Sequence, residues 1–132
     1  MTKDLITCPI ENTLKLLNRK WTIVLIWDMF KGKKYFREFS QIEGLSNTVL
    51  SDTLKDMETK DLITKEGAEY YLTKKGLRLN RILYEMAVYG LDELECGEER
   101  DLEIILMFKN YYKEIFKVDN DESSNIKKET VI

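Results

Sequence analysis

Five polar side chains share one side of a short helical pattern. In "LSNTVLSDTLKDMETKDLI", residues 45–63, apolar residues recur at helical spacing and polar residues fall between them. Small hydroxyl, amide and charged groups donate and accept hydrogen bonds, which is the chemistry that contacts base edges and phosphates of DNA. The candidates for base contacts are Asn47, Thr48, Ser51, Asp52 and Lys55.

A helix over residues 46–58 would position these side chains. Ser46 suits the N-cap, because its hydroxyl can accept a hydrogen bond from an otherwise free backbone N–H. The positive end of the helix dipole would then lie beside the first polar candidates. The predicted buried stripe consists of Leu50, Leu54 and Met57, with Val49 beside them.

Asp52 leaves two interpretations open. An aspartate can accept a hydrogen bond from cytosine, although near phosphates it also repels. Alternatively, Asp52 is an ordinary helix surface charge that pairs with Lys55 or faces solvent.

Basic residues cluster around the segment "KKYFREFSQIEG", which predicts a helix with Phe36, Phe39 and Ile42 inward and an end at Gly44. In a helix-turn-helix the first helix crosses the DNA backbone, so cations beside it suit phosphates. The alternative is a solvated basic turn. The phosphate candidates are Lys31, Lys33, Lys34, Arg37, Lys65, Lys74 and Lys75.

The order of elements predicts an α+β fold that is mostly α, a winged helix-turn-helix domain with C-terminal dimerisation helices. Trp21 and Trp27 are expected in the core. Besides the helices above, the pattern predicts a helix from about Pro9 to Asn18, a buried helix ending at Gly32, a hairpin of residues 62–65 and 70–72, a helix from Thr73 to about Leu94, and a last helix over residues 101–117.

The chain of 132 residues fits one globular domain. The expected division by function is a DNA-binding domain with the start of the dimer helices at 1–95, a dimerisation helix at 96–117 and a disordered tail at 118–132. Dimerisation follows from "IILMF" at 104–108, since a surface helix on a small domain does not need apolar cover all round.

The composition excludes several functional classes. With no histidine and only two cysteines, we expect no catalytic residues, no metal site and no cofactor. No apolar run approaches the roughly 18 residues that span a bilayer, so we expect a cytoplasmic protein with no membrane partner.

Charge differs between the two halves of the chain. Up to Arg81 there are fifteen Lys and Arg against eleven Asp and Glu, and from Ile82 onward there are six against thirteen. A basic first part is a hint of nucleic-acid contact, while ordinary solvated surfaces are the simpler alternative.

Several motifs in order resemble one family. "CPIENTLKLLNRKWTIVLIWDMFKGKKYFREF", followed by "GLSNTVLSDTLKDMETKDLI" and "YYLTKKG", is similar to the HxlR-type winged-helix regulators of the MarR-like group. The resemblance implies a homodimeric transcriptional regulator that binds double-stranded DNA and responds to an electrophile, oxidant or metabolic signal. The wing "TKEGAEYY" is shorter and more acidic than the family pattern.

Cysteine chemistry is a further expectation. Cys8 precedes Pro9 at a helix start, where the helix dipole stabilises a thiolate, and the resemblance implies a redox or electrophile sensor at that place. The alternative is a small buried residue. Cys96 is the candidate resolving partner.

Three functional classes were weighed. The first is a homodimeric regulator on an inverted-repeat operator, and the second a winged-helix module that binds a protein partner, with weak or vestigial DNA binding. Asp52, Asp56, Glu66 and Glu69 favour the second class, and an enzyme has little support. A small-molecule or oxidant effector is also expected, with Tyr84, Tyr89, Tyr111 and Tyr112 as dimer core or as the lining of its cleft.

Overall fold

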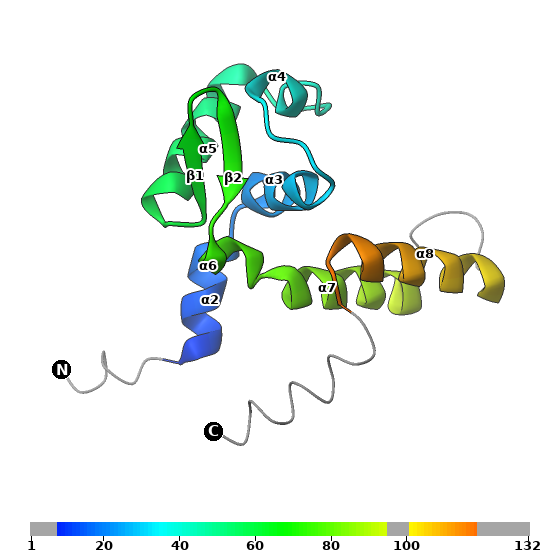
Figure 1. Ribbon diagram of the computed structural model, residues 1–132. Helices are drawn as coiled ribbons and strands as arrows, with labels where there is room; N and C mark the ends of the chain where they lie inside the picture. Colours follow the sequence, from blue (N-terminus) through cyan, green and yellow to red (C-terminus); the bar gives the residue numbers. More distant parts are fainter. Residues whose placement is uncertain (1–7, 95–100, 119–132) are drawn as a thin grey trace. The chain divides into compact units, whose positions relative to one another are not determined.

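The computed structural model describes residues 8–94 and 101–118, and the chain divides into two compact units (Figure 1). Unit 1 ends at Leu77 and unit 2 begins at Arg78. Helices dominate both units, and the described residues contain a single two-stranded sheet, so the mostly α fold class is confirmed. The expected tail from residue 119 onward and residues 1–7 and 95–100 lie outside the described residues.

The first two helices form as predicted. Helix α2 spans Pro9–Leu17 with its proline at the first position, and α3 spans Lys20–Phe30. Helix α3 buries Leu25, Ile26 and Met29 and packs against α2, α5 and the hairpin. The prediction that Trp21 and Trp27 lie in the core was wrong, since both are half-buried, and the ammonium groups of Lys20 and Lys31 lie over their rings.

Helix α4 is shorter than the sequence pattern predicted. It spans Phe36–Phe39, and the chain continues through turns to Leu45 instead of staying helical to Gly44. The Ser40 hydroxyl donates to the Arg37 carbonyl at 2.8 Å, a local bond that competes with helix continuation. Phe39 is fully buried, as predicted, whereas Phe36 and Ile42 are half-buried.

Helix α5, Asn47–Thr59, confirms the helix predicted over residues 46–58. The Ser46 hydroxyl accepts from the Val49 N–H at 3.2 Å, as expected of an N-cap. The prediction that Val49 is buried was wrong, since its side chain is 39% exposed and Thr53, 1% exposed, takes that place. Thr53 can be buried because its hydroxyl donates to the Val49 carbonyl at 2.7 Å. Leu50, Leu54 and Met57 are buried as predicted.

The hairpin pairs β1, Ile63–Glu66, with β2, Glu69–Leu72, in antiparallel register. Glu66 lies opposite Glu69, so the connecting loop has only two residues, and Gly67 adopts a φ of +65° there. The predicted short wing is confirmed. The segment before α4 joins the sheet, because the Tyr70 N–H donates to the Lys34 carbonyl at 2.8 Å.

The "LTKKG" motif ties the wing to the end of α5. Helix α6, Lys74–Leu77, is capped by the Thr73 hydroxyl, which accepts from the Gly76 N–H at 3.1 Å and donates to the Asp61 carbonyl at 2.6 Å. A Cβ at Gly76 would lie 2.2 Å from the Leu62 carbonyl oxygen, so only glycine allows this close approach. The predicted continuous helix from Thr73 to Leu94 was wrong, since α6 ends at Leu77 and turn residues 78–79 precede the next helix.

Unit 2 is an antiparallel pair of helices, α7 Asn80–Glu93 and α8 Leu102–Ile115. Asp101 caps α8, as its carboxylate accepts from the Glu103 N–H at 2.7 Å. At one end of the pair the Asn80 side chain donates to the Phe116 carbonyl, and toward the other end Lys109 pairs with Asp92 at 2.8 Å. The predicted last helix is confirmed.

Candidate nucleic-acid interface

The outward side of α5 carries all the predicted base-facing residues. Ser51 is half-buried and the other four side chains are exposed. Within residues 8–94 and 101–118, none of these five side chains forms a hydrogen bond or ion pair with another residue. Their polar groups are therefore available to an outside partner. The residues are Asn47, Thr48, Ser51, Asp52 and Lys55.

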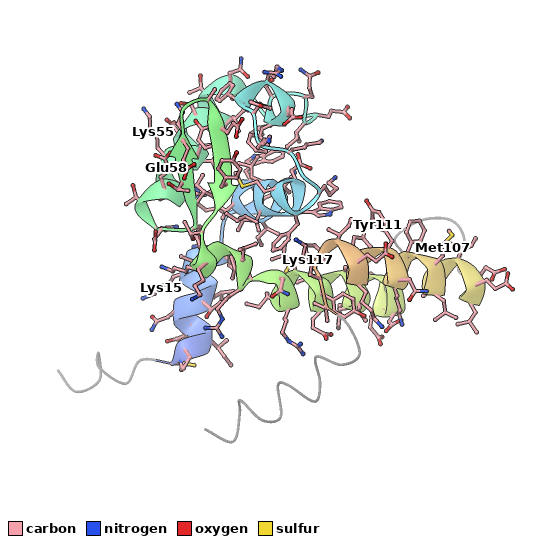
Figure 2. All side chains as sticks on the ribbon, viewed as in Figure 1. Lys15, Lys55, Glu58, Met107, Tyr111 and Lys117 are labelled. Carbon is pink, nitrogen blue, oxygen red and sulfur yellow. The ribbon has the colours of Figure 1, made fainter. Side chains whose placement is uncertain are left out.

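A hollow of about 280 Å³ lies where α5, the start of α4 and the wing meet. Ser51 and Lys55 line it from α5, and Lys65 lines it from β1, with its ammonium 5.5 Å from the centre of the Tyr70 ring. Glu58 adds a carboxylate to this lining, and Figure 2 shows it on α5 together with Lys55. The structure thus brings base-facing and phosphate candidates from two elements to one surface.

Lys31 and Lys33 are held by a carboxylate that sequence reasoning did not identify as part of the site. Asp28 is buried at the end of α3, and its oxygens lie 3.2 Å from the Lys31 ammonium and 3.5 Å from that of Lys33. A buried carboxylate is costly unless it is paired, so these lysines stabilise the turn after α3. The single carboxylate offsets one of their two positive charges.

Lys34 and Arg37 are also engaged within unit 1. The Lys34 ammonium lies 3.9 Å from a carboxylate oxygen of Glu69, and the Arg37 guanidinium lies 4.5 Å from the centre of the Tyr35 ring. Both side chains still reach solvent. Glu69 was expected to belong to an acidic surface and is instead an internal partner.

Glu38 fixes the start of α4. The backbone N–H groups of Lys34 and Tyr35 donate to its Oε1 at 2.8 and 3.0 Å. These bonds favour the charged carboxylate and lower the pKa of Glu38. The result is a defined path for the chain that carries the basic cluster.

The remaining cations differ in their surroundings. The Lys75 ammonium donates to the Lys60 carbonyl at 2.9 Å, at the end of α5. Lys74, on the same short helix, is exposed and has no ion pair in the part of the chain that the structure describes. Lys74 is therefore the most available of the phosphate candidates.

The acidic residues that favoured a protein-binding module do not form one unpaired surface. They are Asp52, Asp56, Glu66 and Glu69. Asp56 pairs with Arg19 at 3.1 Å and with Lys60 at 3.0 Å, which ties α5 to the start of α3. Asp52 and Glu66 are exposed, and neither has an ion pair among the described residues, so the suggested Asp52–Lys55 pair is not formed. Only Asp52 and Glu66 therefore still favour a protein-binding module, because Asp56 and Glu69 are paired within the protein.

Cys8 is the N-cap residue of α2 and its thiol is exposed and free. The alternative of a small buried residue is thereby excluded for the single chain. Cys96 lies outside the described residues, so the structure does not test the pairing of these two cysteines.

Unit 2 exposes a large amount of apolar surface. Ile82, Met86 and Tyr89 line a shallow apolar surface on α7, and Met107 on α8 is 60% exposed. Figure 2 shows Met107 and Tyr111 on α8. Of the four tyrosines proposed for a ligand cleft, Tyr89 alone lines that surface.

A winged helix-turn-helix with an unpaired polar face on its second helix defines a class of DNA-binding protein. The sequence pattern of the HxlR-like helix-turn-helix family matches residues 16–98. The chain belongs to this family of transcriptional regulators, which are not enzymes.

Similarity to individual proteins agrees with this assignment. The chain is 30% identical to the HTH-type transcriptional regulator sll1512 of Synechocystis over 67% of this chain and 71% of that protein. It is 32% identical to YybR of Bacillus subtilis over 63% of this chain and 73% of that protein.

Two crystal structures have a similar fold. Quinone-bound YodB of Bacillus subtilis has a TM-score of 0.59 and 29% identity, covering 63% of this chain and 97% of YodB. PA1607 has a TM-score of 0.64 at 24% identity, covering 77% of this chain and 76% of the other, and this likeness concerns the fold alone. Within the described residues, none of the helices combines the length and apolar character needed to cross a membrane.

Proposed function

We propose that this regulator binds DNA sequence-specifically as a homodimer on an inverted-repeat operator. The observation that carries the proposal is the outward side of α5, where five polar side chains lack a partner among the described residues. Unpaired donors and acceptors on one side of a helix suit base edges in the major groove.

In this proposal the N-terminal part of α5 enters the major groove. Asn47, Thr48 and Ser51 contact bases first, and Asp52 and Lys55 follow on the next turn. Two-fold symmetry then requires half-sites about one helical turn apart.

Phosphate contacts would come from several places on unit 1. Lys74 and Lys65 are the first candidates, because neither has an ion pair within the described residues. Lys31 and Lys33 would act from their places beside Asp28, where they already share one negative charge. Arg37 and Lys75 complete the proposed set, while the charge of the remaining candidate, Lys34, is already offset by Glu69.

The homodimer is proposed from the apolar surface of unit 2. A monomer rarely exposes a contiguous apolar surface of this kind, and self-association would cover it. We accordingly assign DNA binding to residues 1–95 and dimerisation mainly to residues 96–117. The same surface, including Tyr89, is the proposed place for a small-molecule effector.

We also propose that Cys8 responds to an oxidant or electrophile. Its exposed thiol at the start of α2 is accessible to such reagents in the single chain. Support by analogy comes from YodB, whose crystal structure holds a quinone. Replacing Cys8 by serine should abolish any loss of DNA binding caused by diamide.

Fluorescence anisotropy tests the DNA proposal directly. The reduced protein is titrated into DNA from upstream of its own gene and into a scrambled duplex, from low to physiological salt. We expect a preference of about a thousandfold or more for the upstream DNA. Equal binding that vanishes with salt would leave only phosphate contacts and would favour the alternative, a protein-interaction module.

A further inference from the structure

The wing carboxylate of Glu69 lies in a compact cluster with Lys34, Tyr35 and Tyr71, called the Glu69 cluster below. One Glu69 oxygen accepts from the Tyr35 hydroxyl at 3.0 Å, and the other accepts from the Tyr71 hydroxyl. The Lys34 ammonium lies 3.9 Å from that second oxygen. Three side chains from two elements thus converge on one carboxylate.

Lys34 is held in this cluster by more than one contact. Its ammonium lies 5.8 Å from the Tyr35 ring centre and 5.9 Å from the Tyr71 ring centre. Its backbone carbonyl accepts from the Tyr70 N–H at 2.8 Å, and its N–H donates to Glu38 at 2.8 Å. The main chain is therefore fixed on both sides of the residue.

The backbone gives Glu69 a second role. Tyr35 and Glu69 form an isolated antiparallel bridge, which joins the start of α4 to β2. The same residue therefore links the wing to α4 through the backbone and offsets the charge of a phosphate candidate through its side chain.

We propose that Glu69 is a specificity-determining residue, which keeps Lys34 from contacting phosphate and so limits binding to DNA of any sequence. This inference rests on the proposed DNA-binding function. Phosphate contacts raise affinity for all sequences alike, whereas base contacts discriminate. Offsetting the charge of Lys34 lowers the affinity for all sequences and leaves the base contacts of α5 unchanged.

The test compares Glu69→Gln with Glu66→Gln in salt titrations on the scrambled duplex. Glutamine keeps one oxygen that accepts from one tyrosine hydroxyl, and its NH2 group can donate to the other, but it carries no charge to hold an ammonium. Glu66 is the cross-strand neighbour of Glu69, is exposed and has no ion pair among the described residues. Glu66→Gln therefore controls for the loss of one negative charge from the wing. We expect Glu69→Gln to steepen the dependence of log K on log salt by about 0.9 and to raise affinity about fivefold at low salt, with no change of slope in Glu66→Gln.

Lys34→Gln completes the cycle. It should change the slope by less than about 0.3 in the wild-type background and restore the wild-type slope in the Glu69→Gln background. Equal salt slopes for Glu69→Gln and Glu66→Gln would overturn the role of Glu69 while DNA binding itself stands. A decrease of the slope by about 0.9 in Lys34→Gln alone would do the same. Absence of any duplex binding by the wild-type protein at low salt would overturn both proposals.

Discussion

Helices α5 and α8 have similar lengths, 13 and 14 residues, but opposite surfaces. Helix α5 buries Leu54 and its apolar neighbours and turns unpaired polar groups outward. Helix α8 buries none of its residues fully, and Leu106 and Met107 remain exposed. The difference indicates two kinds of partner, a polar one for α5 and an apolar one for α8.

The sharpest contrast uses the same substitution on each helix. Leu54→Ala removes a side chain that is 2% exposed, so we expect a loss of about 2 to 5 kcal/mol in the free energy of unfolding. Leu106 is 50% exposed, and Leu106→Ala should change the stability of the single chain by less than about 0.5 kcal/mol. Urea denaturation at low protein concentration measures both. Equal losses of unfolding free energy in the two variants would contradict the proposed difference between a buried α5 side chain and an exposed α8 side chain.

Adding a charge to α8 should separate two copies of the chain. Met107→Glu places a carboxylate on the apolar surface, where its desolvation opposes burial, and we expect self-association to weaken on the order of a hundredfold. Sedimentation velocity over a concentration series gives the dissociation constant. Gln41→Glu, on unit 1, adds the same charge to an exposed site and should leave the dissociation constant of self-association unchanged.

Removing one amide from each helix tests the polar side of α5. Asn47→Ala should reduce discrimination between the upstream and scrambled duplexes by about 1 to 3 kcal/mol, because a base contact is lost. Asn110, exposed on α8, supplies the control. If Asn110→Ala reduced discrimination as much as Asn47→Ala, α5 would not be the element that contacts bases.

The smallest expected effect concerns a single phosphate contact. Lys74→Gln should lower the salt slope of DNA binding by about 0.9 and weaken all sequences alike. Lys117→Gln removes the same charge from the second residue after α8, on unit 2, and should leave the slope unaltered. Anisotropy titrations at four salt concentrations distinguish these results.

Local chemistry explains what could be predicted from the sequence. The Ser46 cap and the stripe of Leu50, Leu54 and Met57 depend on neighbours within a few residues, and both predictions are confirmed. The "LTKKG" motif was identified only by resemblance, and the structure supplies its physical reason in the close contact of Gly76 with the Leu62 carbonyl.

The failures are of more than one kind, and the shortening of α4 involves a local bond between Ser40 and Arg37. The ion pair of Lys34 with Glu69 joins residues separated by two helices and a strand, and no spacing rule indicates it. The break between α6 and α7 at residues 78–79 is not indicated by the apolar periodicity of the sequence. Asp28 gave a usable signal, because a carboxylate in an otherwise apolar helix needs a cationic partner and Lys31 follows one turn later.

Hydroxyl-radical footprinting on the DNA upstream of the protein's own gene tests the central claim most directly. It reports which backbone positions are covered and whether they are related by two-fold symmetry. We expect two protected half-sites centred about one helical turn, roughly 10 base pairs, apart, and no such pattern with Asn47→Ala at the same concentration. Uniform protection, or none at concentrations that saturate the anisotropy signal, would contradict sequence-specific binding by α5.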